Sequence, residues 1–329
     1  MNKILTMIMP VTFLAGIFSV SSAQKADSGE ILKVYSNFHY GLIEDDHPTA
    51  FEVTRVYLGY KHDLSDHFSA EAKLDIGSPE DLSQYSLIRR YAYFKTAALT
   101  YKDKNLTAWF GLFDMREFKV QENFWGYRYI YKSYQDAYKF GPSADIGTGV
   151  HYRFNDFIEA DLVVSNGEGY KNLQTDNSYK TGAGVTLHPL TDMTFRLYYD
   201  FNHKDITQYT YAFFAGYDAA KYRIGAEYNL QQNFAFVNKH NLYGYSFYGT
   251  YTITDKWEIF GRYDWLHSSL TSAENIPWHL NNDGSAIISG VQYAPVNQVR
   301  FSLNYQDWYS YAKNGTDESY IYVNLEFKL

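Results

Sequence analysis

Residues 114–144 read DMREFKVQENFWGYRYIYKSYQDAYKFGPSA and differ from the chain on both sides of them. The flanking segments alternate apolar and polar side chains and are separated by brief turns, whereas this stretch mixes charged and aromatic residues without alternation. Loops of about 30 residues are uncommon in compact folds and usually have a function. We therefore predict that residues 114–144 fold into the lumen of a transmembrane β-barrel and narrow its channel.

The rest of the chain shows the two-residue period of β-strands. Successive side chains of a strand point to opposite faces of the sheet, so segments such as 67–77 and 317–329 predict strands with one apolar and one polar face. Followed along the chain, the pattern predicts an all-β fold with about 16 antiparallel strands. The predicted strands are 30–42, 50–62, 67–77, 88–101, 105–113, 145–154, 157–166, 178–187, 192–203, 208–218, 220–231, 241–253, 256–267, 284–294, 297–310 and 317–329.

The connections between these strands alternate between short and long. Tight turns such as 155–156 and 254–255 are followed by longer connections such as 167–177 and 268–283. Short turns at one rim and long loops at the other are the arrangement of an outer-membrane barrel, and an even strand count places both termini at the short-turn, periplasmic rim. Aromatic content of 19% with a mean hydropathy of −0.41 fits a barrel that is apolar outside and wet inside. The alternative, a soluble β-sandwich, requires a dry core on one face of each strand.

The first residues have the pattern of a secretory signal peptide. Lys3 precedes a mostly apolar run, and Ser21-Ser22-Ala23 is a small-residue cleavage site. We predict a signal peptide over 1–23, cleavage after Ala23, a barrel domain over 24–329 and a location in the bacterial outer membrane. The alternative, a transmembrane anchor, fits less well because the apolar run is interrupted and falls short of about 20 residues.

Composition argues against several other classes of protein. The chain has no cysteine, which excludes disulfides and thiolate chemistry, and its net charge of −8 argues against a nucleic-acid partner. The ten histidines show no zinc-binding spacing, and Ser143 in GPSAD lacks the second glycine of a nucleophile elbow. We therefore expect no enzyme activity, no cofactor and no metal site.

The predicted outer surface suggests membrane edges and a subunit contact. Trp257 and Trp265 lie eight residues apart on one face of a strand, a separation of roughly 19 Å along the membrane normal that suits two aromatic girdles. The outward residues of the third to fifth strands are small or aliphatic, which predicts a protein–protein surface. The residues of this surface are Ala70, Ala72, Leu74, Ala92, Leu106 and Ala108.

Glycines and charges predict how the loop lies in the lumen. Glycine in a strand often marks close approach of another backbone, so we expect the loop to contact the fifth, sixth and eighth strands. The glycines concerned are Gly111, Gly147, Gly149, Gly182 and Gly184. Opposite them, a basic wall is expected on the second to fourth strands, facing carboxylates of the loop. The tyrosines at 127, 129, 131 and 134 either pack the loop or provide stacking surfaces for sugar-like solutes.

The candidate pore constriction combines wall and loop charges, because charged rings set the ion preference of pores. The alternative is that these charges pair with one another and only hold the loop in place. The candidate residues are Arg116, Glu117, Lys119, Glu122, Arg128 and Lys132 of the loop and Arg55, Lys73, Arg89 and Lys95 of the wall.

Four segments, taken in order, resemble the phosphate-selective porin O/P family, in particular its shorter members from Bacteroidetes-type outer membranes. The segments are FEVTRVYLGYKHDLS (51–65), GLFDMREFKVQENFWGYRYIYKS (111–133), FGPSADIGTGVHYRF (140–154) and SNGEGY (165–170). The resemblance implies a 16-stranded, trimeric porin whose third long loop folds into the pore.

Three functions follow as hypotheses. The first is an outer-membrane porin that lets small hydrophilic solutes and ions diffuse through passively. Such a protein would contact the lipid bilayer and lipopolysaccharide, and we expect it to form a homotrimer. The second is a channel selective for phosphate or another anion. The third is an outer-membrane enzyme or adhesin on a barrel scaffold.

Overall fold

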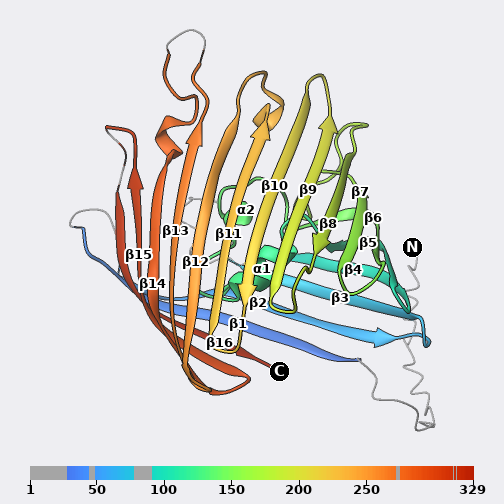
Figure 1. Ribbon diagram of the computed structural model, residues 1–329, viewed down its shortest axis with the longest axis horizontal. Helices are drawn as coiled ribbons and strands as arrows, with labels where there is room; N and C mark the ends of the chain where they lie inside the picture. Colours follow the sequence, from blue (N-terminus) through green and yellow to red (C-terminus); the bar gives the residue numbers. More distant parts are fainter. Residues whose placement is uncertain (1–27, 44–48, 78–90, 272–274, 314, 316) are drawn as a thin grey trace, which may run out of the picture.

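A computed structural model describes residues 28–43, 49–77, 91–271, 275–313, 315 and 317–329. Sixteen strands, each antiparallel to its neighbours, form a single sheet that closes where β1 pairs with β16 (Figure 1). The prediction of a closed, all-β barrel of 16 strands is therefore confirmed. The predicted signal peptide (1–23) and Arg89 lie outside the described residues.

The strands occur where alternation predicted them, and their ends differ from the predicted ones by at most two residues except at β4. They are β1 (Gly29–Gly41), β2 (Ala50–Asp63), β3 (Phe68–Gly77), β4 (Tyr91–Asp103), β5 (Leu106–Asp114), β6 (Ala144–Arg153), β7 (Ile158–Ser165), β8 (Lys180–Leu187), β9 (Met193–His203), β10 (Thr207–Asp218), β11 (Tyr222–Gln232), β12 (Leu242–Thr254), β13 (Trp257–Ser268), β14 (Gly284–Val296), β15 (Val299–Ser310) and β16 (Glu318–Lys328).

The irregular pattern of β4 has a structural cause. Lys73 of β3 pairs with Thr96, but the next residue, Leu74, pairs with Phe94, so β4 contains one extra residue at Lys95. Lys95 and Thr96 are consecutive and both buried. Such a β-bulge shifts the alternation between the two faces, which explains why the pattern in this strand is blurred.

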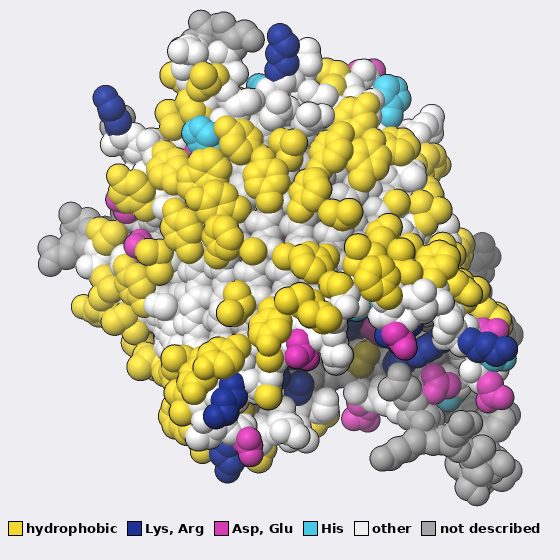
Figure 2. Space-filling view, viewed as in Figure 1, with side chains coloured by type: hydrophobic (Ala, Val, Ile, Leu, Met, Phe, Trp, Pro, Cys, Tyr) yellow, Lys and Arg dark blue, Asp and Glu magenta, His cyan; other side chains and the backbone are white. Residues whose placement is uncertain are grey.

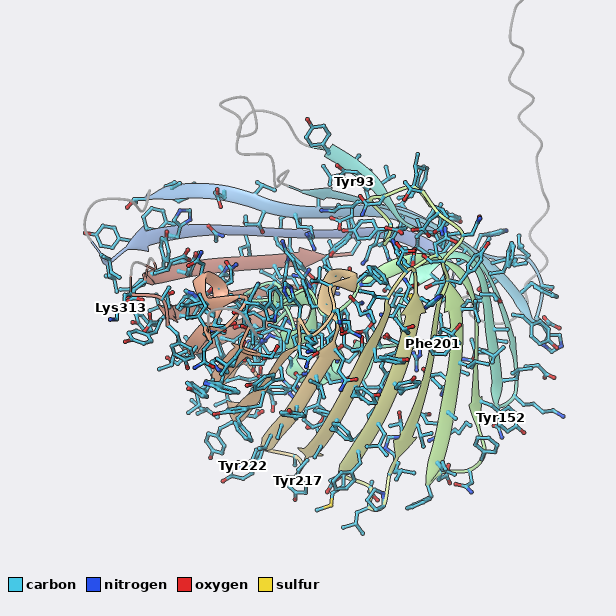
Figure 3. All side chains as sticks on the ribbon, turned by 90° about the horizontal axis from the view of Figure 1, so that it is seen from above. Tyr93, Tyr152, Phe201, Tyr217, Tyr222 and Lys313 are labelled. Atoms are coloured by element: carbon cyan, nitrogen blue, oxygen red, sulfur yellow. The ribbon has the colours of Figure 1, made fainter. Side chains whose placement is uncertain are left out.

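The two rims differ as predicted. Short turns, including 219–221 and 255–256, connect strands at one rim, and the long connections lie at the other. The start of β1 and the end of β16 are both at the short-turn rim, where Lys33 pairs with Lys328. In Figure 3, Tyr217 and Tyr222 lie at adjacent strand ends on this rim, whereas Lys313 lies at the opposite rim.

The outer face of the barrel is apolar. Figure 2 shows hydrophobic side chains spread across it, with charged groups concentrated toward its edges. The two tryptophans of β13 lie near its opposite ends, Trp257 against Tyr293 (ring centroids 4.5 Å apart) and Trp265 against Tyr245 (5.2 Å). This arrangement fits aromatic girdles at both edges of an apolar band.

The predicted small-residue surface on β3–β5 is less smooth than expected. Ala72 does pair with Ala97, but Phe94 and Phe110 project from the same outer face and are 58% and 71% exposed. The prediction that the outward residues there are only small or aliphatic was wrong. Phe94 lies two residues after Ala92 and Phe110 two residues after Ala108, so strand alternation places both on the outer face, but the predicted set did not include them.

The helices are short. Two of them, α1 (Lys119–Trp125) and α2 (Tyr134–Ala137), lie in the long connection between β5 and β6, and η1 (Phe234–Phe236) and η2 (Leu280–Asn282) are single turns in later connections. In the described part of the chain, no helix has the length and apolar character needed to cross a bilayer.

Candidate functional site

The connection between β5 and β6, residues 115–143, lies inside the barrel, and we call it the lumen loop. In Figure 1, α1 and α2 are seen between the strands in front and the wall behind. Hydrogen bonds join the lumen loop to the inner wall: Tyr127 donates to Glu258 of β13 at 2.8 Å and Tyr129 to Gln292 of β14 at 2.9 Å. The predicted folding of the third long loop into the lumen is thus confirmed.

Aromatic packing holds the lumen loop against one half of the wall. Trp125, Tyr127 and Tyr129 are buried in a cluster with Phe214, Tyr248, Phe260 and Ile288 of β10–β14. Tyr127 stacks on Phe260 with ring centroids 4.5 Å apart. Of the two roles considered for the loop tyrosines, packing applies to Tyr127, Tyr129 and Tyr134, which are all buried. The lumen loop and the inner face of β10–β14 therefore form a buried hydrophobic core, and this part of the wall does not face water.

Buried ion pairs add to this attachment on β7–β9. Lys180 of β8 binds Glu117 of the loop at 2.5 Å and Asp200 of β9 at 2.7 Å. Arg196 of β9 binds Asp161 at 2.7 Å and also donates to the backbone oxygen of Arg116 at 2.8 Å. Two carboxylates thus share Lys180.

Burial is the main reason why the pKa of Glu117 is raised to about 7. Lys180 opposes the shift, and the neighbouring Asp200 adds to it.

The predicted contact between the loop and the glycines was wrong. The space above Gly182 is occupied by Tyr198, and the space above Gly184 by Arg196, both from the neighbouring strand β9. Gly111, Gly147 and Gly149 likewise face atoms of adjacent strands. The lumen loop instead approaches Gly216 with Phe124 and Gly244 with Tyr134. A strand glycine makes room for any large neighbour, so its presence does not identify which neighbour it is.

The space that the lumen loop leaves open contains three cavities. One of about 680 Å³, which we call the inner cavity, lies toward the short-turn rim and is lined by Asp255 and Lys256 of the β12–β13 turn. Two others, of about 440 and 460 Å³, lie toward the long-loop rim, and we call them the outer cavities. Ser143 lines the inner and the first outer cavity, and Arg128 lines the inner and the second. Each outer cavity therefore adjoins the inner cavity at a residue of the lumen loop.

Most candidate constriction residues line these cavities. Lys73, Lys95, Lys119, Glu122 and Arg128 line the inner cavity. Arg55 and Lys132 line both outer cavities. Arg116 and Glu117 line none of the three: the Arg116 guanidinium lies 5.5 Å from the ring centre of Trp109, and Glu117 is fully buried. Only part of the predicted set is therefore exposed to the lumen cavities.

The junction between the cavities, which we call the throat, is a network of opposite charges. From the wall, Arg55 lies 3.2 Å from Asp75, and Lys95 donates to Ser143 of the loop at 2.5 Å. From the loop, Arg128 lies 2.9 Å from Asp136 and 3.5 Å from Glu122. Acids and bases alternate here, so the expected separation into a basic wall and acidic loop is absent from the throat.

The carboxylate of Asp136 in the lumen loop is kept in its charged form by the bases around it. Burial disfavours the charged form of Asp136, but Arg128, Lys132 and Lys95 outweigh burial and lower its pKa. Asp136 therefore neutralises part of the basic charge around it. Asp114, at the end of β5, lies 3.4 Å from Lys119 and 3.8 Å from Lys95 and does the same.

Even so, basic side chains outnumber acidic ones around all three cavities, although the whole chain carries a net charge of −8. The basic residues of the inner cavity are Lys33, Lys73, Lys95, Lys119, Arg128, Arg223, Lys256, Arg300 and Lys328, and its acidic residues are Asp114, Glu122, Asp255, Glu258 and Glu326. Lys33 and Lys328 are direct partners across the β1–β16 seam. Like charges placed opposite each other are unfavourable unless an anion or solvent compensates them.

Several of these lumen residues were missing from the sequence-based set. Lys33, Arg223, Arg300 and Lys328 occupy inward positions of their strands, so the alternation that predicted the strands contained the signal for them. The inward folding of the 166–179 connection had no such signal. Its Tyr170 reaches Asp75 of β3 with a hydrogen bond of 2.8 Å.

A serine, a histidine and an aspartate meet at the long-loop rim, and their geometry matters for the enzyme hypothesis. Ser268 donates its hydroxyl to Asp283 at 2.7 Å, and His279 lies 3.3 Å from the same carboxylate. In a catalytic triad the imidazole lies between serine and acid, but here the acid is central. Among the described residues, no three His, Asp or Glu side chains are grouped as a metal site. These contacts hold the connection between β13 and β14 in place.

No family model matches the sequence, and no curated protein matches it. The fold is similar to that of several solved structures. Salmonella typhi OmpF, in a complex with daunomycin, has a TM-score of 0.68 at 11% identity, covering 92% of this chain and 97% of that chain. The outer membrane channel DcaP of Acinetobacter baumannii has a TM-score of 0.66 at 10% identity (95% and 100% covered). An OmpT trimer form from Vibrio cholerae gives 0.60 at 13% (93% and 100%). At these identities the comparisons establish the fold, and the family resemblance remains a prediction.

Proposed function

We propose that this protein is an outer-membrane porin through which small hydrophilic solutes and ions diffuse. One observation carries the proposal: the lumen loop packs against β10–β14 as a core and leaves cavities lined by charged side chains in the rest of the lumen. An apolar outer face suits lipid, and a charged inner face suits water. The similarity of the fold to an outer membrane channel supports this function.

We further propose that the channel prefers anions, with phosphate and carboxylates as the chemical class. The excess of basic side chains around the cavities supports this preference, because the sign of the lining charge sets which ions enter a pore. The throat residues proposed to set it are Arg55, Lys73, Lys95, Lys119, Glu122, Arg128 and Lys132. The family resemblance points to the same class of solute.

The proposed context is a homotrimer in the outer membrane, exported with a signal peptide that is cleaved after Ala23. The similarity to a protein whose structure is described as a trimer form supports the assembly. The predicted contact surface on β3–β5 retains small residues, with Phe94 and Phe110 as protruding anchors. Chemical crosslinking in mild detergent tests it: a species of three subunits is expected, and a monomer alone would remove the proposal.

Planar-bilayer recording of the purified protein tests the channel itself. Stable conductance steps are expected, with a reversal potential in a salt gradient that reports anion preference. An anion-to-cation permeability ratio near one would reject the anion preference, and the proposal of a porin without charge selectivity would remain. Absence of any conductance step would reject the channel and favour the enzyme or adhesin hypothesis.

A further inference from the structure

A second connection also folds into the lumen, between β7 and β8. Its backbone follows the end of β6, with Asn166 donating to Ile146 and Tyr170 to Ala144, both at 3.0 Å. From there the Tyr170 hydroxyl donates to Asp75 of β3, which lies four strands away from β7 in the sheet. We call residues 166–179 the second inward loop.

Two glycines give this loop its path. Gly167 and Gly169 have φ values of 91° and 80°, a conformation in which any other residue is strained. A Cβ on Gly169 would also lie 2.9 Å from the Cβ of Pro142 in the lumen loop. The two inward loops are therefore in close contact, and the backbone geometry directs Tyr170 toward the throat.

Tyr170 contacts both signs of charge. Its hydroxyl binds Asp75, which also lies 3.2 Å from Arg55. Its ring lies under the ammonium of Lys95, 4.5 Å from the ring centre. A cation over an aromatic face is attracted to it and partly shielded from solvent. Tyr170 thus restrains the acid that neutralises Arg55 and covers one of the throat lysines.

The position of these contacts is where the cavities meet. Tyr170 lines the first outer cavity, and Arg55 lines both outer cavities. Ser143, the hydrogen-bond partner of Lys95, lines the inner cavity and the first outer cavity. A solute passing between these two cavities therefore passes beside Tyr170.

We propose that Tyr170 is a specificity-determining residue of the throat. Its ring limits the width of the passage, and its hydroxyl sets the charge by keeping Asp75 directed at Arg55. The inference rests on the proposed channel function and adds a selectivity element outside the lumen loop. Conservative and truncating variants separate the two effects because they remove different parts of the side chain.

The test is single-channel recording of Tyr170→Phe, Tyr170→Ala and Asp75→Asn beside the wild type. Y170F keeps the ring, so the conductance stays unchanged. It removes the hydroxyl that holds Asp75, so this carboxylate can turn toward the passage and the anion-to-cation permeability ratio falls. Y170A removes the ring, so conductance rises. In a D75N background Y170F has no further effect on permeability, because the carboxylate it would release is absent. Tyr179→Ala, at an exposed position of the same connection, is the matched control and leaves both values unchanged.

The outcomes separate this inference from the proposed function. If the wild type conducts and Y170A and Y170F match it in conductance and permeability, Tyr170 has no such role and the channel remains. If the wild type shows no conductance, the proposed function itself fails. Thermal unfolding followed by circular dichroism shows whether each variant is folded, and Y170F, which preserves shape, decides the charge effect if Y170A does not fold.

Discussion

The two halves of the lumen are built from strands of the same pattern but have opposite character. On β9–β14 several inward side chains are buried on the side where the lumen loop packs, among them Arg196, Thr210 and Asp264. On β2–β4 the inward side chains of Arg55 and Lys73 remain partly exposed to cavities. The difference shows that polar alternation defines an inner face, whereas the position of one loop decides whether that face becomes core or channel.

Removing the central aromatic of the packed half is expected to have the largest effect. Trp125 is 1% exposed and contacts Tyr127, Tyr248 and Phe260, so Trp125→Ala is expected to lower the free energy of unfolding by about 3–5 kcal/mol. Thermal unfolding and proteolysis of residues 115–143 measure it. Phe247→Ala, at an exposed position of β12 on the outer face, is the control. A W125A protein as stable and protease-resistant as the wild type would show that this half is not a core.

The ion pairs of the packed half are expected to respond to pH. Because the pKa of Glu117 is raised from 4.5 to about 7, mainly by burial, the folded state holds this proton more tightly than the unfolded chain. This group therefore stabilises the fold increasingly as pH falls from about 7 toward 4.5. Glu117→Gln should remove that part of the pH dependence, seen as a flatter plot of melting temperature against pH. Parallel plots for the two proteins would contradict the assignment.

A smaller effect is expected from a single buried hydroxyl in the packed half. Tyr129→Phe removes the hydrogen bond to Gln292, and loss of such a bond costs about 1 kcal/mol. Denaturant unfolding measures the change, with Tyr152→Phe at the exposed rim as control. Equal losses in both variants would mean that the Tyr129 bond contributes nothing specific.

The smallest energetic effect, but the sharpest contrast, is expected between two arginines of the same loop. Arg128 lines the cavities and Arg116 does not. Arg128→Gln should reduce the anion-to-cation permeability ratio about twofold, equivalent to about 0.4 kcal/mol, while Arg116→Gln leaves it unchanged. Reversal potentials in a salt gradient distinguish the two. A shift in R116Q equal to that in R128Q would contradict the division of the lumen.

Alternation along the sequence was sufficient for the strands and for the loop that interrupts them, because burial of one face imposes a strict two-residue period. The strict period is interrupted at Lys95, which does point inward as predicted but is followed by a second buried residue, Thr96, because β4 contains one extra residue. The glycines that the lumen loop approaches were predicted incorrectly, since Gly182 and Gly216 look alike in sequence while one accommodates Tyr198 and the other Phe124. Pairings such as Tyr170 with Asp75 join residues 95 apart and depend on the closed barrel.

The attachment of the lumen loop also constrains the order of assembly. Its tyrosines at 127 and 129 bind partners on β13 and β14, more than 130 positions later in the chain. Contacts this distant form slowly, because the intervening chain must first be ordered. These two bonds need β13 and β14, so the lumen loop cannot complete its attachment before those strands are present, and a chain truncated ahead of β13 would leave Tyr127 and Tyr129 without these partners.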